Sequence, residues 1–268
     1  MRLFLSDLIS RHQTLWRIMH QPYKVIRPGT KVRILLGHAA NMHMYLDNNF
    51  NYACGYWEFP LQEALAKVLS RGQVYYDIGA NVGLFTLVGA RLAGPTGRVV
   101  AFEPCPRFIE KLRSNIQINH LENTTVIPKA VSDRNSRVKM YWQSSMSHLS
   151  TAEGLDSAPK QKYEETSESH MVDTISLDEF DGPPPDVIKV DVEGSELAVL
   201  RGAQRLLSSR NAPTLILELH SPFLATEAGQ LLRAHGYRFY SPWEKFRPLE
   251  EPIFYTVAAP PRLTFSWM

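Results

Sequence analysis

A glycine-rich turn follows the apolar run 74–78 and leads into a predicted helix. The turn reads DIGANVG, from Asp77 to Gly83. Its glycines permit a tight turn and a close approach of the backbone to a ligand. A helix that begins near Gly83 directs its free amides, with their partial positive charge, toward the same place. The turn therefore predicts a binding site for a small molecule that carries a carboxylate.

A second carboxylate, Glu103, directly follows the next predicted strand. A carboxylate at this position can accept hydrogen bonds from both hydroxyls of a ribose. Dinucleotide-binding proteins carry G-x-G-x-x-G, whose middle glycine lets the backbone approach a pyrophosphate. That glycine is missing here, and Asn81 stands one position further on. Asp77 and Glu103 thus favour a nucleoside without a pyrophosphate, S-adenosylmethionine, over a nicotinamide or flavin cofactor.

A third group of polar side chains is expected at the ends of two later strands. Alternation along an extended chain puts Lys189, Asp191 and Glu193 on one side. Glu218 and His220 follow at the same edge of the sheet. A hydroxyl that receives a methyl group needs a base or a metal beside it. Two mechanisms stay open: a base among Asp191, Glu193 and His220, or Mg²⁺ held by Asp191, Glu193 and Glu218.

Short apolar runs alternate with amphipathic segments through most of the chain. The predicted strands are 74–78, 98–102, 124–127, 187–190, 215–219, 237–240 and 253–257. The predicted helices are 61–69, 84–92, 107–119, 195–207 and 227–235. This order predicts an α/β fold, with a seven-stranded, mostly parallel sheet and helices on both faces. Glu196, at the start of the fourth of these helices, is interpreted as a structural charge at a helix start.

Two segments stand outside this alternation. Residues 1–70 are a predicted N-terminal extension with an amphipathic helix, a short strand over 31–36 and the lead-in helix 61–69. Residues 71–268 are the predicted main domain. Within it, residues 136–175 are too long for a plain connection. We interpret this insertion as a lid or substrate loop, with an added hairpin or a partly disordered surface excursion as the alternatives. The amphipathic helix is compatible with a homodimer.

Composition narrows the class of protein. The chain has 268 residues, a hydrophobic fraction of 44% and a net charge of +2, which argue for a globular protein and against one that coats nucleic acid. Its two cysteines, Cys54 and Cys105, form no disulfide framework and no zinc motif, so a cytoplasmic location is predicted. No stretch is apolar for long enough to span a bilayer. Nucleic-acid partners are further disfavoured because DVEG stands where methyltransferases of base amines usually carry an N-P-P-Y-like motif.

Several segments together resemble the FkbM-type methyltransferases. They are VYYDIGANVGLFT, VVAFEPCP, KLRSNIQINHLEN, TVIPKAVSD and VIKVDVEGSE, in the family's order between about residues 56 and 220. The resemblance implies a Rossmann-like class I enzyme that converts S-adenosylmethionine to S-adenosylhomocysteine. It also implies O-methylation of a small molecule, sugar or natural product. N-methylation, or methylation of RNA or a peptide at the same cofactor site, is the alternative, and a nicotinamide-dependent oxidoreductase is a more distant one.

The resemblance also implies roles for residues at matching positions. Around the methionine end of the cofactor it puts Asp77, Gly79, Asn81 and Gly83. Beside the ribose it puts Glu103 with Pro104, and beside the adenine it puts the turn of Ala130, Val131, Ser132 and Asp133. Alternation along the strand 187–190 in addition puts Asp191 at the strand tip, next to the sulfonium. Glu58, in the family-like YWE, closes over the cofactor or is a surface glutamate.

Overall fold

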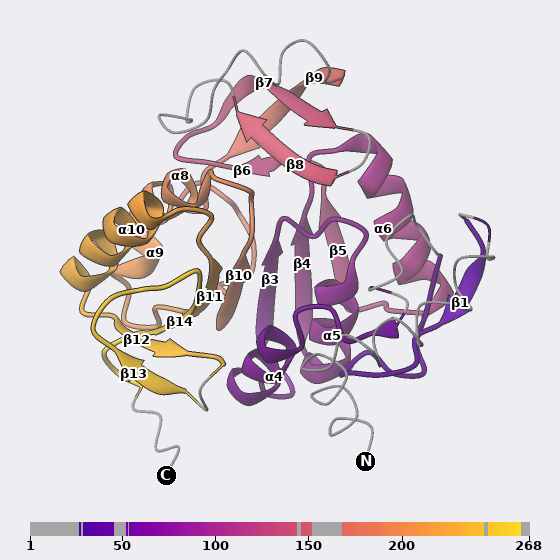
Figure 1. Cartoon of the computed structure of the whole chain (residues 1–268), viewed down its shortest axis with the longest axis horizontal. Helices are drawn as coiled ribbons and strands as arrows, with labels where there is room; N and C mark the ends of the chain where they lie inside the picture. Colours follow the sequence, from indigo (N-terminus) through magenta and orange to yellow (C-terminus); the bar gives the residue numbers. More distant parts are fainter. Residues whose placement is uncertain are drawn as a thin grey trace.

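A large twisted sheet forms the centre of the molecule (Figure 1). The computed structural model describes residues 27, 29–45, 52, 54–143, 146–151, 168–243 and 246–263, and only the backbone of 142–143, 146–151 and 168. The strand order of the sheet is β13-β12-β14-β11-β10-β3-β4-β5. The five parallel strands are β3 (Val74–Ile78), β4 (Arg98–Phe102), β5 (Thr124–Ile127), β10 (Val187–Val190) and β11 (Thr214–Glu218).

The other end of the sheet is antiparallel. β14 (Tyr255–Ala259) lies antiparallel between β11 and β12 (Arg238–Ser241), and β13 (Arg247–Leu249) pairs antiparallel with β12. The predicted mostly parallel sheet is confirmed, but the structure has eight strands where seven were predicted. The eighth, β13, has the sequence RPL and is mostly exposed, so it lacks the apolar pattern that identifies a strand.

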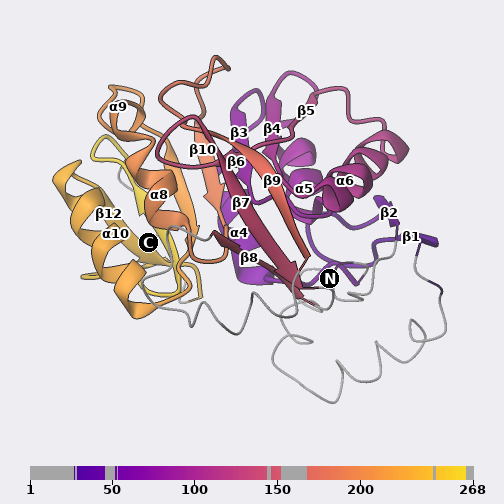
Figure 2. The ribbon, with the colours of Figure 1, turned by 90° about the horizontal axis from the view of Figure 1, so that it is seen from above.

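Helices cover both faces of this sheet (Figures 1 and 2). Leu65 of α4 (Phe59–Val68) and Leu87 of α5 (Leu84–Ala93) pack with Tyr75 on one face, where α6 (Pro106–Ile118) also lies. α8 (Glu196–Arg201), α9 (Gln204–Leu207) and α10 (Pro222–Ala234) pack on the other face, against Ile188 and Leu217. Four of the parallel strands, β3, β4, β10 and β11, are therefore buried on both sides, as their continuous apolar runs predict, whereas β5 at the edge of the sheet is only partly buried.

The predicted helix 195–207 is wrong in one respect, because it is interrupted. α8 ends at Arg201 and α9 begins at Gln204. A Cβ atom on Gly202 would lie 2.0 Å from the carbonyl oxygen of Ser132. The break thus lies where the chain passes against the backbone of the turn 130–133, which lines the candidate site described below.

The predicted insertion forms a sheet of its own. β6 (Ala130–Val131), β7 (Ser136–Gln143), β8 (Met146–Thr151) and β9 (Glu168–Ile175) have the order β6-β9-β7-β8, with β7 antiparallel to both β8 and β9. In Figure 1 this sheet lies above the central strands. The added-hairpin interpretation therefore fits the antiparallel pair of β7 and β8. The polar run 152–167 lies outside the described residues.

The N-terminal extension is attached to α6. β1 (Lys31–Arg33) pairs antiparallel with β2 (His43–Tyr45), and β1 is shorter than the predicted strand 31–36. The side chain of Asn115 accepts a hydrogen bond from the Tyr45 amide at 2.8 Å. The amphipathic helix predicted within residues 1–26 lies outside the described residues. Within the described part of the chain, no helix has the length and apolar character needed to cross a membrane.

Candidate active site

A cavity of about 280 Å³ lies at the carboxyl ends of the parallel strands, as predicted for the ligand site of an open α/β sheet. Most of the predicted binding residues line it: Gly79, Asn81, Glu103, Pro104, Ala130, Val131, Ser132, Asp191 and Glu193. Glu58, Asp77 and Gly83 are not among its lining residues. The structure thus brings together the turn after β3, the end of β4, the turn 130–133 and the loop after β10.

Glu103 is held in a fixed position at one side of this cavity. Its side chain is buried and accepts hydrogen bonds from the backbone amides of Asn81, at 2.8 Å, and Cys105, at 2.9 Å. Burial raises the pKa of Glu103 to about 7, although both amide bonds oppose this shift. Because a carboxylate has four lone-pair sites, Glu103 can still accept bonds from a ligand.

Gly79 joins two parts of the site. Its φ is +80°, and a Cβ atom there would lie 1.8 Å from the carbonyl oxygen of Asp191. Only glycine permits this contact between the turn after β3 and the loop after β10. Gly83, with φ +99°, instead allows α5 to approach Leu112 of α6, since its Cβ atom would lie 2.5 Å from Leu112 Cδ1. A direct contact between Gly83 and a cofactor stays a prediction.

Asp77 lies below the cavity in a buried ion-pair network. Parallel register puts Lys189 of β10 beside Asp77 of β3, with Nζ 3.8 Å from Asp77 Oδ1. The Thr86 hydroxyl donates to Asp77 Oδ2 at 2.6 Å. Lys189 Nζ also lies 3.0 Å from Asp191 Oδ2 and 4.9 Å from the ring centre of Phe85. The predicted alternation of Lys189 and Asp191 on one side is therefore confirmed.

Burial has opposite effects on the two partners of this pair. Burial raises the pKa of Asp77, and Lys189 and Thr86 offset part of the shift. Burial also opposes the charged form of Lys189, but the carboxylates of Asp191, Asp77 and Glu58 outweigh it and hold the Lys189 pKa above its ordinary value. Lys189 is thus a permanent buried cation beneath the cavity.

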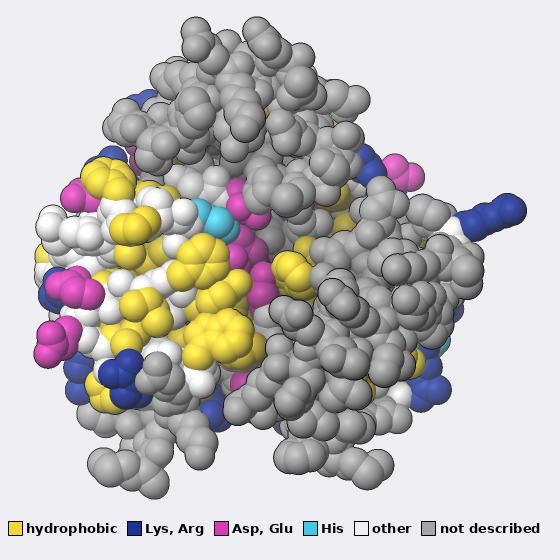
Figure 3. All heavy atoms as spheres, viewed as in Figure 1, with side chains coloured by type: hydrophobic (Ala, Val, Ile, Leu, Met, Phe, Trp, Pro, Cys, Tyr) yellow, Lys and Arg dark blue, Asp and Glu magenta, His cyan; other side chains and the backbone are white. Residues whose placement is uncertain are grey.

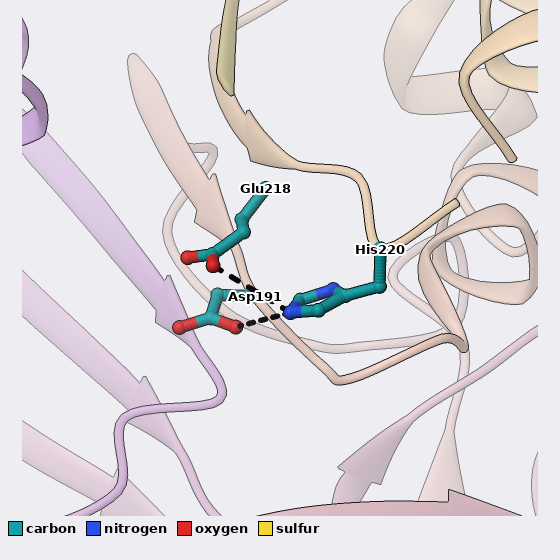
Figure 4. Close-up of side chains that lie close together, drawn as sticks. All are labelled: Asp191, Glu218 and His220. Carbon is teal, nitrogen blue, oxygen red and sulfur yellow. Dashed lines mark ion pairs between the residues drawn. The ribbon is translucent and has the colours of Figure 1, made fainter. Parts of the chain in front are cut away.

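Four carboxylates surround the imidazole of His220. Its Nε2 lies 3.1 Å from Glu193 Oε2, 3.6 Å from Glu218 Oε1 and 3.9 Å from Asp191 Oδ1. Figure 4 shows Asp191 and Glu218 pointing toward the ring. On the opposite side of the ring, Nδ1 lies 2.8 Å from Glu196 Oε1. Burial alone would lower the His220 pKa, but the hydrogen bond to Glu196 and the charges of Glu196, Glu193 and Asp191 raise it to about 9.

Two carboxyls at this cluster have raised pKa values: Glu218, one of the four, and Glu58, which adjoins them. Burial, followed by the charge of Asp191, raises the pKa of Glu218 to about 7. Burial, followed by the charges of Glu218 and Asp191, raises the pKa of Glu58 well above its ordinary value. Glu58 precedes α4 with a left-handed φ of +47°. The site thus collects more negative than positive side chains, and some of them retain protons.

A metal ion could use part of this cluster. One oxygen of Asp191, one of Glu218 and one ring nitrogen of His220 lie within 4.8 Å of one another. The predicted magnesium set had Glu193 in place of His220. Mg²⁺ prefers oxygen ligands, and Lys189 already pairs with Asp191. The described geometry therefore suits a mixed nitrogen and oxygen set better than the predicted all-carboxylate one.

Two further groups of residues at the site were not predicted from the sequence. Val138 and Met140 of β7 line the cavity, so the insertion contributes directly to its wall. An aromatic group made of Trp243, Phe254 and Tyr255 adjoins the acidic cluster, since the ring centres of Phe254 and His220 are 5.5 Å apart. Figure 3 shows acidic side chains and a histidine beside a hydrophobic patch on this face. The alternation of the apolar residues Val138 and Met140 with Lys139 is the sequence pattern that indicates the strand β7.

Comparison with known proteins matches the chain to methyltransferases. Residues 77–239 match the family model described as the methyltransferase FkbM domain. The chain is 33% identical over 153 residues to the hexuronic acid methyltransferase AglP of Haloferax volcanii, covering 55% of this chain and 56% of that protein. It is 30% identical over 197 residues to the 31-O-demethyl-FK506 methyltransferase FkbM of Streptomyces tacrolimicus, covering 63% of this chain and 74% of that protein.

A solved structure, methyltransferase FkbM from Methylobacillus flagellatus KT, has a TM-score of 0.46 and 16% identity to the chain. The match covers 80% of this chain and 56% of that one. The chain spans little more than half the length of the first curated relatives, 56% of AglP and 56% of a methyltransferase from Beauveria bassiana.

Proposed function

Because the chain belongs to the FkbM methyltransferase family, we propose that it transfers a methyl group from S-adenosylmethionine to a hydroxyl of a small molecule, sugar or natural product. One observation carries the proposal: a single cavity is lined both by the buried carboxylate of Glu103 and by Asp191 and Glu193. A nucleoside-binding acid and two of the three candidate bases therefore share one cavity. The name of the relative FkbM, a 31-O-demethyl-FK506 methyltransferase, supports an oxygen acceptor, and the name of AglP supports a sugar.

The residues present fit S-adenosylmethionine. Glu103 offers carboxylate oxygens to the ribose, and Gly79 and Asn81 offer backbone close to the ligand. Ala130, Val131 and Ser132 would adjoin the adenine. When bound, the cofactor supplies a methyl group already activated as a sulfonium. The protein's main task is then to align the acceptor, which can contribute several kcal/mol to the rate.

The acceptor hydroxyl must lose its proton as its oxygen bonds to the methyl carbon. Asp191 is the base that we favour, because it lines the cavity and is paired with the permanent cation Lys189. Glu193 and His220 lie beside it and can orient the hydroxyl or pass the proton on. If Mg²⁺ takes part instead, a chelator should abolish transfer and added magnesium should restore it.

The side chains around the transfer site favour an uncharged acceptor. Asp191, Glu193 and Glu218 would repel a phosphate or a second carboxylate at this position. Phe254 and Trp243 are exposed beside them and offer apolar rings to a sugar or natural product. Phosphate backbones of nucleic acids are disfavoured by the same charges.

Glu103→Ala should weaken the binding of S-adenosylmethionine and S-adenosylhomocysteine by about 100-fold or more, because two charge-assisted hydrogen bonds to the ribose are lost. Calorimetric titration with either ligand measures this, and a thermal melt checks that the variant folds. Glu110→Ala, which removes an exposed glutamate of α6, is the matched control. If the wild-type chain binds neither ligand, or if Glu103→Ala binds as the wild type does, the proposal is wrong.

Cofactor affinity should also depend on pH through Glu103. Its pKa of about 7 lies above the ordinary value, so the group is mostly protonated at pH 6 and mostly charged at pH 8. Since the charged carboxylate is the better acceptor, affinity should rise about tenfold between these two pH values. Titrations of the wild type and Glu103→Gln across this range measure the effect. The same rise in Glu103→Gln would assign the dependence to another group.

A further inference from the structure

Glu196 lies deeper in the protein than its position at a helix start requires. It is the first residue of α8, its exposure is 0%, and its Oε1 accepts a hydrogen bond from the Gly194 amide at 3.0 Å. The same oxygen lies 2.8 Å from Nδ1 of His220, 24 residues further along the chain. Its other oxygen, Oε2, is buried without a hydrogen-bond partner in the described part of the chain.

Stabilisation of a helix start does not explain this burial. A glutamate in the first turn can favour the helix dipole while it stays exposed to water. Burial of a carboxylate costs several kcal/mol unless a charged partner offsets the cost. The contact that the burial makes possible is the one with His220, which joins α8 to the segment after β11.

The contact with Glu196 decides which ring nitrogen faces the transfer site. With the Nδ1 proton donated to Glu196, Nε2 is the atom directed at Glu193, Glu218 and Asp191. The ring of Phe254 packs against the same imidazole in a T-shaped arrangement, with ring centres 5.5 Å apart. A carboxylate that holds one ring nitrogen fixes the orientation of a histidine ring, and the protonated ring that the raised His220 pKa favours can donate from Nε2 as well.

We propose that Glu196 is a positioning residue for the transfer step: it holds the His220 ring so that Nε2 faces Glu193 and Asp191, the two carboxylates that line the cavity. The inference rests on the proposed methyl transfer. Glu196 is not among the residues that line the cavity. Its carboxylate accepts a hydrogen bond from the backbone amide of the lining residue Gly194, and it acts on the transfer site through the side chain of His220.

A double-mutant cycle tests this role. Glu196→Gln, His220→Gln and the double variant are compared in the transfer of labelled methyl from S-adenosylmethionine into a metabolite extract. Glu196→Gln should lower turnover by about 10- to 100-fold and leave the affinity for S-adenosylhomocysteine within threefold. In the His220→Gln background the same change should cost less than twofold. Glu179→Gln, an exposed glutamate, is the control.

Nitrogen-15 spectra of the histidines give a readout that does not need an acceptor. The wild type should show a proton on Nδ1 of His220 that is protected from exchange, and Glu196→Gln should lose this protection. Three outcomes would each overturn the positioning role. The losses of turnover in the two single variants could multiply in the double variant, Glu196→Gln could keep the wild-type turnover, or it could lose affinity and turnover equally. A wild type that binds no S-adenosylhomocysteine would instead overturn the proposed function, so the two failures are distinguishable.

Discussion

Asp191→Asn is expected to lower methyl transfer by about 10² to 10⁴-fold, the range for loss of a general base. Affinity for S-adenosylhomocysteine should change far less, because asparagine keeps the size of the side chain and the backbone contact with Gly79. The uncharged amide cannot take up the acceptor's proton. Labelled methyl transfer into a metabolite extract measures turnover, and calorimetric titration measures affinity.

Asp181→Asn is the matched control, since Asp181 is an exposed aspartate outside the cavity lining. Near-normal turnover in Asp191→Asn would assign the base to Glu193 or His220. A loss of affinity as large as the loss of turnover would show that Asp191 serves the cofactor rather than the transfer step. Mass spectrometry of the labelled product would also identify the acceptor.

The location of this site could be predicted because one rule of sheet geometry connects distant segments. Asp77 lies one residue before the end of a short apolar strand, Glu103 and Asp191 directly follow such strands, and parallel strands bring their carboxyl ends to one edge. The order of elements was predictable for a similar reason, since buried parallel strands are continuous apolar runs. β13 lacked that pattern and was missed.

Contacts that depend on loops could not be predicted in this way. Glu196 and His220 meet because the loop after β10 turns back through Glu193 and Gly194, both with positive φ. Nothing in the spacing of the two residues indicates a 2.8 Å contact. Likewise, the sequence of β7 does not indicate that Val138 and Met140 line the cavity, because that depends on how the insertion sheet lies over the strands.

The buried cation Lys189 links the fold to the chemistry of the site. One carboxylate oxygen of Asp77 and one of Asp191 lie within 4 Å of its ammonium group. Asp77 lies near the end of β3, which leads into the candidate ligand-binding turn, and Asp191, the candidate base, follows β10. Removal of one partner from a buried ion pair leaves charge without compensation, which typically costs about 3–5 kcal/mol. Domains of this size have only about 5–15 kcal/mol of stability.

Lys189→Met should therefore lower the free energy of unfolding by about 3–5 kcal/mol at pH 8, measured by urea denaturation. Without Lys189, the already raised pKa of Asp77 rises further, so this carboxyl keeps its proton more readily. A carboxyl whose folded pKa lies above its unfolded pKa is destabilising as pH rises, and the loss should be smaller at pH 5 than at pH 8.

Lys189→Arg, which keeps the charge, should lose less than Lys189→Met. Lys31→Met, at an exposed position of β1, should cost little. A loss in Lys189→Met that is equal at both pH values would mean that Lys189 stabilises the sheet by packing, not by its charge.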